Sequence, residues 1–192
     1  PDAHRLYRAV PWSGGGEPIW YGRGQDANGA KRTAYLDQAN IIGYPDHYVQ
    51  STERHPMDYL ATEVIAARGW DNRRIGVEMD NYYFSAAAYA SLQKHLPRAH
   101  WIDANALVNW QRAVKSPREI EYMRIAARIV ERMHQDIVEH IEPGMRKNEL
   151  VARIYATGIG GVPAANGHPG HGGDYPAIVP LLPTGADAAA PH

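Results

Sequence analysis

The chain has 192 residues, and 20 Lys and Arg stand against 21 Asp and Glu, which gives a formal net charge of −1. This balance creates no field for nucleic acid or an anionic membrane surface, so neither is expected as a partner. The absence of cysteine excludes a disulfide framework, thiol catalysis and a cysteine-type zinc site. No apolar run reaches the roughly 18 residues of a membrane span, and the first residues do not form a signal peptide, so we expect a cytoplasmic protein.

Short apolar runs alternate with helical patterns through the first half of the chain. The sequence predicts strands at residues 19–21, 41–44, 75–79 and 99–103. Helices are predicted over 56–69, where Pro56 suits the first helical position, and over 85–97, which Ser85 can cap. This order and spacing indicate an α/β layer, with right-handed crossovers wherever the strands are parallel.

A domain boundary is expected after this alternating region. Residues 107–115 have the pattern of a connector, and we place the boundary between domains 1–113 and 114–192. Ser116-Pro117-Arg118-Glu119 then forms a capping box with proline at the first helical position, followed by apolar residues at helical spacing up to Ile141. A second helix is predicted through residues 150–155, ending at Gly158.

Two glycine groups near the N-terminus invite a phosphate-loop interpretation. Gly14-Gly15-Gly16 and Gly22-Arg23-Gly24 both lack the spacing of such loops, and neither is expected to open a helix, so turns are favoured. The polar segment 25–32 follows the second group and contains Asn28-Gly29, a dipeptide that favours turns. This segment is predicted to be either a simple turn or a loop that faces a ligand or a partner.

Residues 158–192 differ in composition from the rest of the chain, because they are rich in Gly, Pro, Ala and His. They contain one strand candidate, at 177–179. His168 and His171 bracket Pro-Gly and cannot share a helix face, so a solvated loop is favoured over a metal site. These two histidines therefore predict neither a metal nor a cofactor in this segment.

Polar residues flank the strand candidate at 177–179 in surroundings of small residues. Such surroundings suit a site where the backbone comes close to a ligand, and Asp174 precedes the strand while His192 follows it. Histidine is the usual general acid or base near neutral pH. Taken alone, however, a terminal histidine is expected to be exposed rather than catalytic.

The segment 115–127 (KSPREIEYMRIAA) resembles the opening helix of the catalytic domain in the creatinase/aminopeptidase P/prolidase superfamily. The resemblance implies a creatinase-type N-terminal α/β domain followed by the first part of a pita-bread α+β catalytic domain. Within the superfamily, the chain is most similar to ectoine hydrolases. That similarity is carried by residues 20–31 (WYGRGQDANGAK), 43–50 (GYPDHYVQ), 76–83 (GVEMDNYY) and 172–180 (GGDYPAIVP), with Gly185-Ala186-Asp187 and Pro191-His192.

The resemblance implies hydrolysis of the cyclic amidine C–N bond of ectoine, which yields N-acetyl-diaminobutyrate. The histidine of this family that matches His192 contacts the substrate, and in the metal-free creatinase branch it is the acid/base, so the resemblance makes His192 the catalytic candidate. Asp174 becomes the candidate for binding the amidinium, and Tyr175 for stacking or hydrogen bonding. The resemblance also implies a homodimer that uses no metal.

Three segments depart from the family pattern. Residues 1–15 do not resemble it, residues 162–171 look like an insertion, and the sequence ends at His192, before the second half of a pita-bread domain. We therefore expect a truncated chain that by itself is weak or inactive. Two alternatives stay open, namely an Xaa-Pro-type metallopeptidase and a non-catalytic creatinase-N-type interaction domain.

Overall fold

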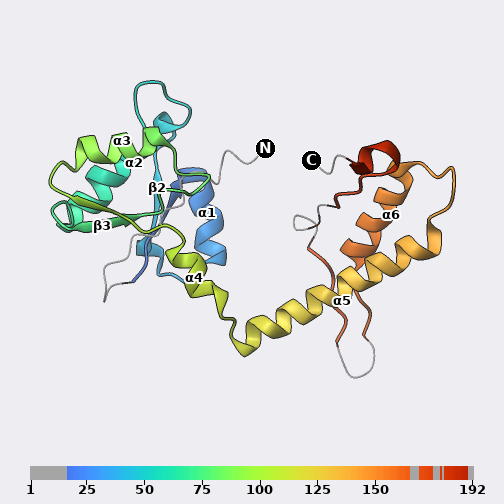
Figure 1. Cartoon of the computed structure of the whole chain (residues 1–192). Helices are drawn as coiled ribbons and strands as arrows, with labels where there is room; N and C mark the ends of the chain where they lie inside the picture. The colour runs from blue at the N-terminus through green and yellow to red at the C-terminus, as the bar shows by residue number, and fades with distance from the viewer. Residues whose placement is uncertain (1–16, 165–168, 175–177, 179, 190–192) are drawn as a thin grey trace. The chain divides into compact units, whose positions relative to one another are not determined.

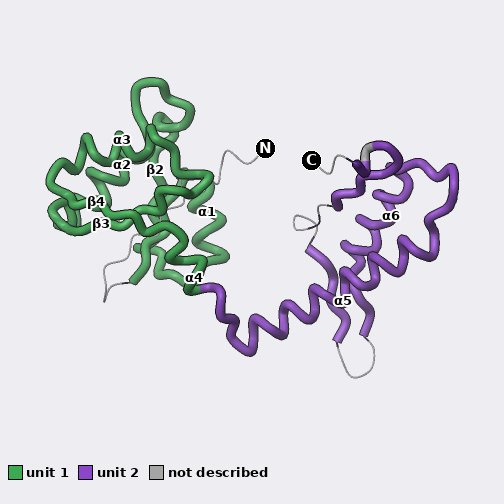
Figure 2. Tube along the Cα trace, in the orientation of Figure 1, with its two compact units in different colours: residues 1–111 green, residues 112–192 purple. Residues whose placement is uncertain are grey.

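A computed structural model describes residues 17–164, 169–174, 178 and 180–189 (Figure 1). The chain divides into two compact units, Pro1–Gln111 and Arg112–His192 (Figure 2). The domain boundary between residues 113 and 114 stays a prediction. No helix in the described part of the chain is both long enough and apolar enough to cross a membrane.

Unit 1, residues 1–111, contains two pairs of parallel strands. Strand β1 (Trp20–Arg23) pairs with β2 (Ile41–Tyr44), and β3 (Arg74–Val77) pairs with β4 (His100–Asp103). Helix α1 (Gly24–Thr33) lies between the first two strands in sequence, and α3 (Ala86–His95) between the second two. Parallel neighbours require such crossovers. The four predicted strands and the α/β character are thereby confirmed.

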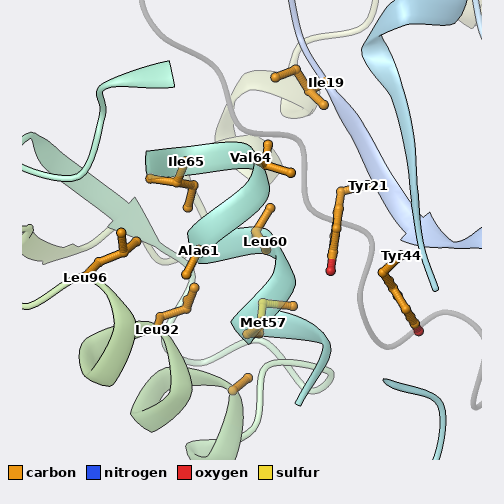
Figure 3. Close-up of a cluster of buried hydrophobic side chains, with 11 residues drawn as sticks. Ile19, Tyr21, Tyr44, Met57, Leu60, Ala61, Val64, Ile65, Leu92 and Leu96 are labelled. Atoms are coloured by element: carbon orange, nitrogen blue, oxygen red, sulfur yellow. The ribbon is translucent and has the colours of Figure 1, made fainter. Parts of the chain in front are cut away.

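The core of unit 1 is built around one helical run. It begins as α2 (Pro56–Tyr59), continues as the π-helical η4 (Leu60–Ile65) and ends as η5 (Ala66–Arg68), just before Gly69. This confirms the predicted helix over 56–69. Its buried side chains pack with residues of β1, β2 and α3 (Figure 3). The members of this cluster are Ile19, Tyr21, Tyr44, Met57, Leu60, Ala61, Val64, Ile65, Ala88, Leu92 and Leu96.

The prediction that Gly22-Arg23-Gly24 opens no helix is wrong. Gly24 is the first residue of α1, and segment 25–32 is helical rather than a turn or loop. The inner face of the helix explains the difference, because Ala27 and Ala30 are buried against Ile41 of β2. Burial of this apolar face overrides the local turn preference of Asn28-Gly29.

The connector predicted at 107–115 is also partly helical. Residues Leu107–Ala113 form α4, and every residue of this helix is exposed. The sequence pattern correctly excluded it from the core, since it has no continuous buried face. Helix α4 begins directly after Ala106, which has a positive φ of 57°.

Unit 2, residues 112–192, consists mainly of two packed helices, α5 (Pro117–His140) and α6 (Lys147–Gly160). The predicted capping box is confirmed. The Ser116 hydroxyl accepts from the Glu119 N–H at 3.3 Å, and the Glu119 carboxylate accepts from the Ser116 N–H at 2.7 Å. A short η7 (Gly185–Ala189) follows. The strand candidate at 177–179 lies outside the described residues except for Ile178, which is not in a strand.

One carboxylate ties α5 to α6. Asp136 of α5 accepts a hydrogen bond from the Thr157 hydroxyl of α6 at 3.1 Å and lies 3.5 Å from the Arg153 guanidinium. On its own helix it lies 3.2 Å from Nδ1 of His140. Its side chain is largely buried, so these contacts replace the water that an ionised carboxylate would otherwise bind. They fix the register of the helix pair that leads to the C-terminal segment.

A buried hydroxyl joins β1 to the start of α2. Tyr21 is fully buried, and its hydroxyl donates to the Pro56 carbonyl at 2.5 Å. Burial raises the pKa of Tyr21 well above its usual value, with further contributions from Tyr44, Tyr59 and Tyr48. The hydroxyl therefore stays protonated and available as a donor.

Replacing Tyr21→Phe leaves the Pro56 carbonyl without this donor inside the core. The carbonyl still accepts from the Leu60 N–H, so we expect the free energy of unfolding to fall by about 0.5–1.5 kcal/mol, the usual net contribution of one hydrogen bond. Urea unfolding measures it. The control is Tyr35→Phe, since Tyr35 is 90% exposed and its hydroxyl faces water. Equal stability of both variants would show that the hydrogen bond contributes nothing.

A polar cluster connects the start of α2 to α3. His55 caps α2, because its Nδ1 accepts from the Met57 N–H at 3.1 Å while its own N–H donates to Asp58 at 2.9 Å. Asp58 also accepts from the Ser91 hydroxyl at 2.7 Å and lies 3.1 Å from Nε2 of His95. Burial opposes the ionisation of Asp58, but these hydrogen bonds and the charge of His95 outweigh it and lower its pKa.

Burial lowers the pKa of His55 from its ordinary value of 6.5, although the charge of Asp58 acts in the opposite direction. The unfolded chain therefore binds a proton at a higher pH than the folded chain, and stability falls as the pH drops below that ordinary value. Protonation also removes the Nδ1 acceptor that caps α2.

We expect the urea midpoint to decrease as the pH is lowered from about 7.5 to about 5. The decrease should be smaller in His55→Asn, which keeps a capping acceptor and removes the titrating group. His47→Asn is the matched control because His47 is exposed on the same unit. A pH profile unchanged by His55→Asn, relative to this control, would contradict the assignment.

Candidate functional site

The structure describes one of the residues predicted for the active site. Asp174 lies in an irregular segment of unit 2, exposed to solvent, and its carboxylate has no ion-pair partner among the described residues. Tyr175 and His192 lie outside the described residues. Whether Asp174, Tyr175 and His192 meet in one site therefore stays a prediction.

Asp174 is positioned by a close crossing of two backbone segments. The segment leading to it passes directly over the end of α6, and the Gly173 N–H donates to the Ile159 carbonyl at 3.1 Å. A Cβ atom on Gly173 would overlap the Gly158 carbonyl oxygen. Likewise, a Cβ atom on Gly161 would overlap the His171 carbonyl oxygen. Only glycine permits this approach, as expected for the small-residue surroundings noted in the sequence.

The segment predicted to be an insertion is closed at its base. Val162 and His171 form an antiparallel bridge in which each N–H donates to the other residue's carbonyl at 2.9 Å. The two ends of the segment 162–171 therefore lie side by side. Because the bridge brings His171 back to the end of α6, Asp174 follows α6 closely in space despite the intervening residues.

A side chain just beyond Asp174 packs at the junction of α5 and α6. The space in front of Gly158 is filled by Cδ1 of Ile178 and by the Met133 sulfur, which would lie 2.9 Å and 3.1 Å from an added Cβ atom. Chain segments on both sides of Tyr175 are thus anchored to unit 2.

No three His, Cys, Asp or Glu side chains of the described residues come close enough together to hold a metal ion. His171 is half-buried by its place in the bridge, whereas His168 lies outside the described ranges. The described residues thus offer no ligand set for a metal.

Sequence reasoning missed a second polar site, because it treated segment 25–32 as a turn or loop. Helix α1 borders a hollow of about 490 Å³ lined by Trp20, Gln25, Asp26 and Thr33 together with small residues of the helix. We call this feature the α1 hollow. One oxygen of Asp26 is buried without a hydrogen-bond partner among the described residues. The sequence did contain a signal for this feature, because the polar residues of segment 25–32 allowed the alternative that the segment faces a ligand.

Comparison with known proteins assigns each of the two parts of the chain to a protein family. Residues 16–114 match the Creatinase/Prolidase N-terminal domain, and residues 121–192 match Metallopeptidase family M24. An ectoine hydrolase of Halomonas elongata is 60% identical over 177 residues, which is 92% of this chain and 44% of the relative. An uncharacterized hydrolase/peptidase of Sinorhizobium fredii is 41% identical over 79% of this chain and 38% of its own length.

Solved structures share the fold at low identity. An Xaa-Pro dipeptidase from Bacillus anthracis matches with a TM-score of 0.55 at 18% identity, over 73% of this chain and 35% of that one. An X-Pro aminopeptidase from Thermotoga maritima matches with a TM-score of 0.52, over 73% of this chain and 34% of that one. These likenesses establish the architecture of a creatinase-type α/β domain followed by the start of a pita-bread domain.

The chain spans less than half the length of the curated relatives that it matches. The matched residues lie in both units of the chain. They confirm the resemblance to the creatinase/prolidase superfamily and to ectoine hydrolases that the sequence motifs indicated. The chain belongs to the creatinase/prolidase family, with its N-terminal domain at residues 16–114 and a metallopeptidase family M24 region at residues 121–192.

Proposed function

We propose that this chain forms part of an enzyme that hydrolyses the cyclic amidine C–N bond of ectoine to give N-acetyl-diaminobutyrate. The observation that carries the proposal is the 60% identity to an ectoine hydrolase over 92% of the chain. Solved peptidase structures match at 18% identity, which supports the fold and not a peptidase substrate. The identity to a hydrolase of named substrate is therefore the stronger argument.

The proposed reaction exchanges one bond for another at the amidine carbon. Water attacks this carbon and forms a C–O bond, the ring C–N bond breaks, and the leaving nitrogen gains a proton. The carbon becomes the carbonyl of an acetamide, and no redox change occurs. One histidine can serve both steps if it accepts the proton from water and then donates it to the leaving nitrogen.

We assign this acid/base role to His192, and the binding of the amidinium to Asp174. An exposed carboxylate without an ion-pair partner among the described residues is available to an incoming cation. The glycine crossing before Asp174 supports a positioning role, because it fixes where the segment leaves α6. Tyr175, the next residue, is proposed to stack on the substrate or to hydrogen bond with it. We also propose the homodimer that the resemblance implies.

The proposal can be tested in a chimera in which the part of the Halomonas elongata ectoine hydrolase beyond its matched region follows His192. We expect His192→Ala to lower the turnover of ectoine by about 100-fold or more, since it removes the general acid/base. Proton NMR of the product's acetyl methyl group measures turnover. His134→Ala is the control, because His134 is exposed on α5. Undiminished turnover in His192→Ala would remove His192 from the mechanism.

The positioning role of the glycine crossing can be tested in the same chimera. Gly173→Ala introduces a Cβ atom against the Gly158 carbonyl, so the backbone must separate and Asp174 must shift. We expect kcat/KM for ectoine to fall by about tenfold or more. Gly172→Ala is the matched control, because its Cβ atom would meet the Ile159 carbonyl at an ordinary 3.8 Å. Equal effects of the two substitutions would contradict a specific role of the crossing.

A further inference from the structure

The end of α6 supports the crossing that leads to Asp174, yet its own residues do little to hold it in place. Three of the four residues 158–161 are glycines, which favour a helix least of all residues except proline. The fourth, Ile159, is 45% exposed, so its side chain contributes little packing. The helix end that carries the crossing therefore needs an anchor from outside these four residues.

Thr157 is the last residue of α6 whose side chain can hydrogen bond, because only glycine and isoleucine follow it. Its hydroxyl donates to Oδ2 of Asp136 on α5 at 3.1 Å, and its carbonyl accepts from the Gly161 N–H at 2.9 Å. Gly161 is one of the two glycines at which the returning chain passes too closely for a Cβ atom. Thr157 thus connects α5 directly to the crossing.

The acceptor of this hydrogen bond is a carboxylate that is largely shielded from water. The Asp136 side chain is 18% exposed, and its Oδ1 atom lies 3.2 Å from Nδ1 of His140 and 3.5 Å from the Arg153 guanidinium. These neighbours leave Oδ2 to Thr157. A hydrogen bond to a carboxylate is stronger than one between neutral groups, and its loss leaves a shielded oxygen without that donor.

One turn of α5 contacts the crossing at two points. Met133, three residues before Asp136, packs its sulfur against Gly158, while Asp136 holds the residue before that glycine. The residue after the same glycine accepts the hydrogen bond from the Gly173 N–H. Contacts therefore run without a gap from Asp136 to the backbone that precedes Asp174.

We propose that the hydrogen bond between Asp136 and Thr157 positions Asp174 for the substrate. Both are positioning residues, because they act through the crossing and do not touch the substrate themselves. The inference rests on the proposed function, in which Asp174 binds the amidinium. The geometry that it requires can nevertheless be measured without any substrate.

Amide hydrogen exchange of the present chain tests this geometry. The Gly173 N–H is protected while it donates to Ile159, and we expect Thr157→Val to raise its exchange rate by about tenfold or more. Valine keeps the shape of threonine without the hydroxyl, whereas Thr157→Ser keeps the hydroxyl and should retain most of the protection. Thr33→Val is the matched control, because the Thr33 hydroxyl donates within α1, to the Gly29 carbonyl at 3.0 Å.

A second variant approaches the same hydrogen bond from its acceptor. Asp136→Ala should also expose the Gly173 amide, and the double variant with Thr157→Val should exchange no faster than Asp136→Ala alone. Circular dichroism checks that each variant folds. Unchanged protection of Gly173 in Thr157→Val, or a loss in Thr157→Ser as large as in Thr157→Val, would overturn the inference.

Kinetics of the chimera described above test whether the positioning acts through Asp174. We expect Thr157→Val to lower kcat/KM for ectoine by about tenfold, and to cause no further decrease in an Asp174→Ala background. A further decrease of the same size in that background would show that Thr157 acts elsewhere, and would overturn the inference. An unmodified chimera that does not turn over ectoine would instead contradict the proposed function, and the exchange measurement would then decide the positioning alone.

Discussion

The C-terminal part of this molecule depends on the close contact between the end of α6 and the segment that returns over it. Backbone meets backbone there, with no room for a Cβ atom on Gly161 or Gly173. The bridge between Val162 and His171 closes the intervening residues, so their length does not alter where the chain resumes. The position of Asp174 is thereby determined by main-chain contacts and not by the packing of large side chains.

A comparable principle operates in unit 1, where small residues let α1 lie close to its sheet. Ala27 and Ala30 face Ile41, and this contact stabilises a helix in a segment whose local preference is a turn. The same helix carries Asp26 and borders the α1 hollow. Both this hollow and Asp174 therefore lie beside segments that pack through glycine or alanine, where the backbone can approach a neighbour closely.

Much of the architecture could be predicted from local patterns. The capping box at Ser116 and Glu119, the proline at residue 56 and the four apolar strand runs each encode their element within a few residues. Helix α1 could not be predicted in this way, because its stability comes from burial against β2, a contact between residues distant in sequence. The exposed α4 lacks the buried face on which a periodic pattern depends.

The candidate site could be predicted only in part. Asp174 and the glycines before it stand out in the sequence as polar and small residues around an apolar run, and the structure explains the glycines through the crossing at α6. Their chemical roles could not follow from spacing, since nothing local to Asp174 or His192 specifies a substrate. Those roles rest on the resemblance to ectoine hydrolases, and the contacts of Tyr175 and His192 lie outside the described residues.

We propose that this chain belongs to an enzyme that acts on a cyclic amidine and not on a peptide. The most direct measurement supplies two substrates, ectoine and an Xaa-Pro dipeptide, to the chimera, both with and without a metal chelator, and follows each by proton NMR. We expect the acetyl signal of ring-opened ectoine to accumulate under both conditions while the dipeptide stays intact. Cleavage of the dipeptide in the absence of chelator, with ectoine unchanged under either condition, would contradict this proposal.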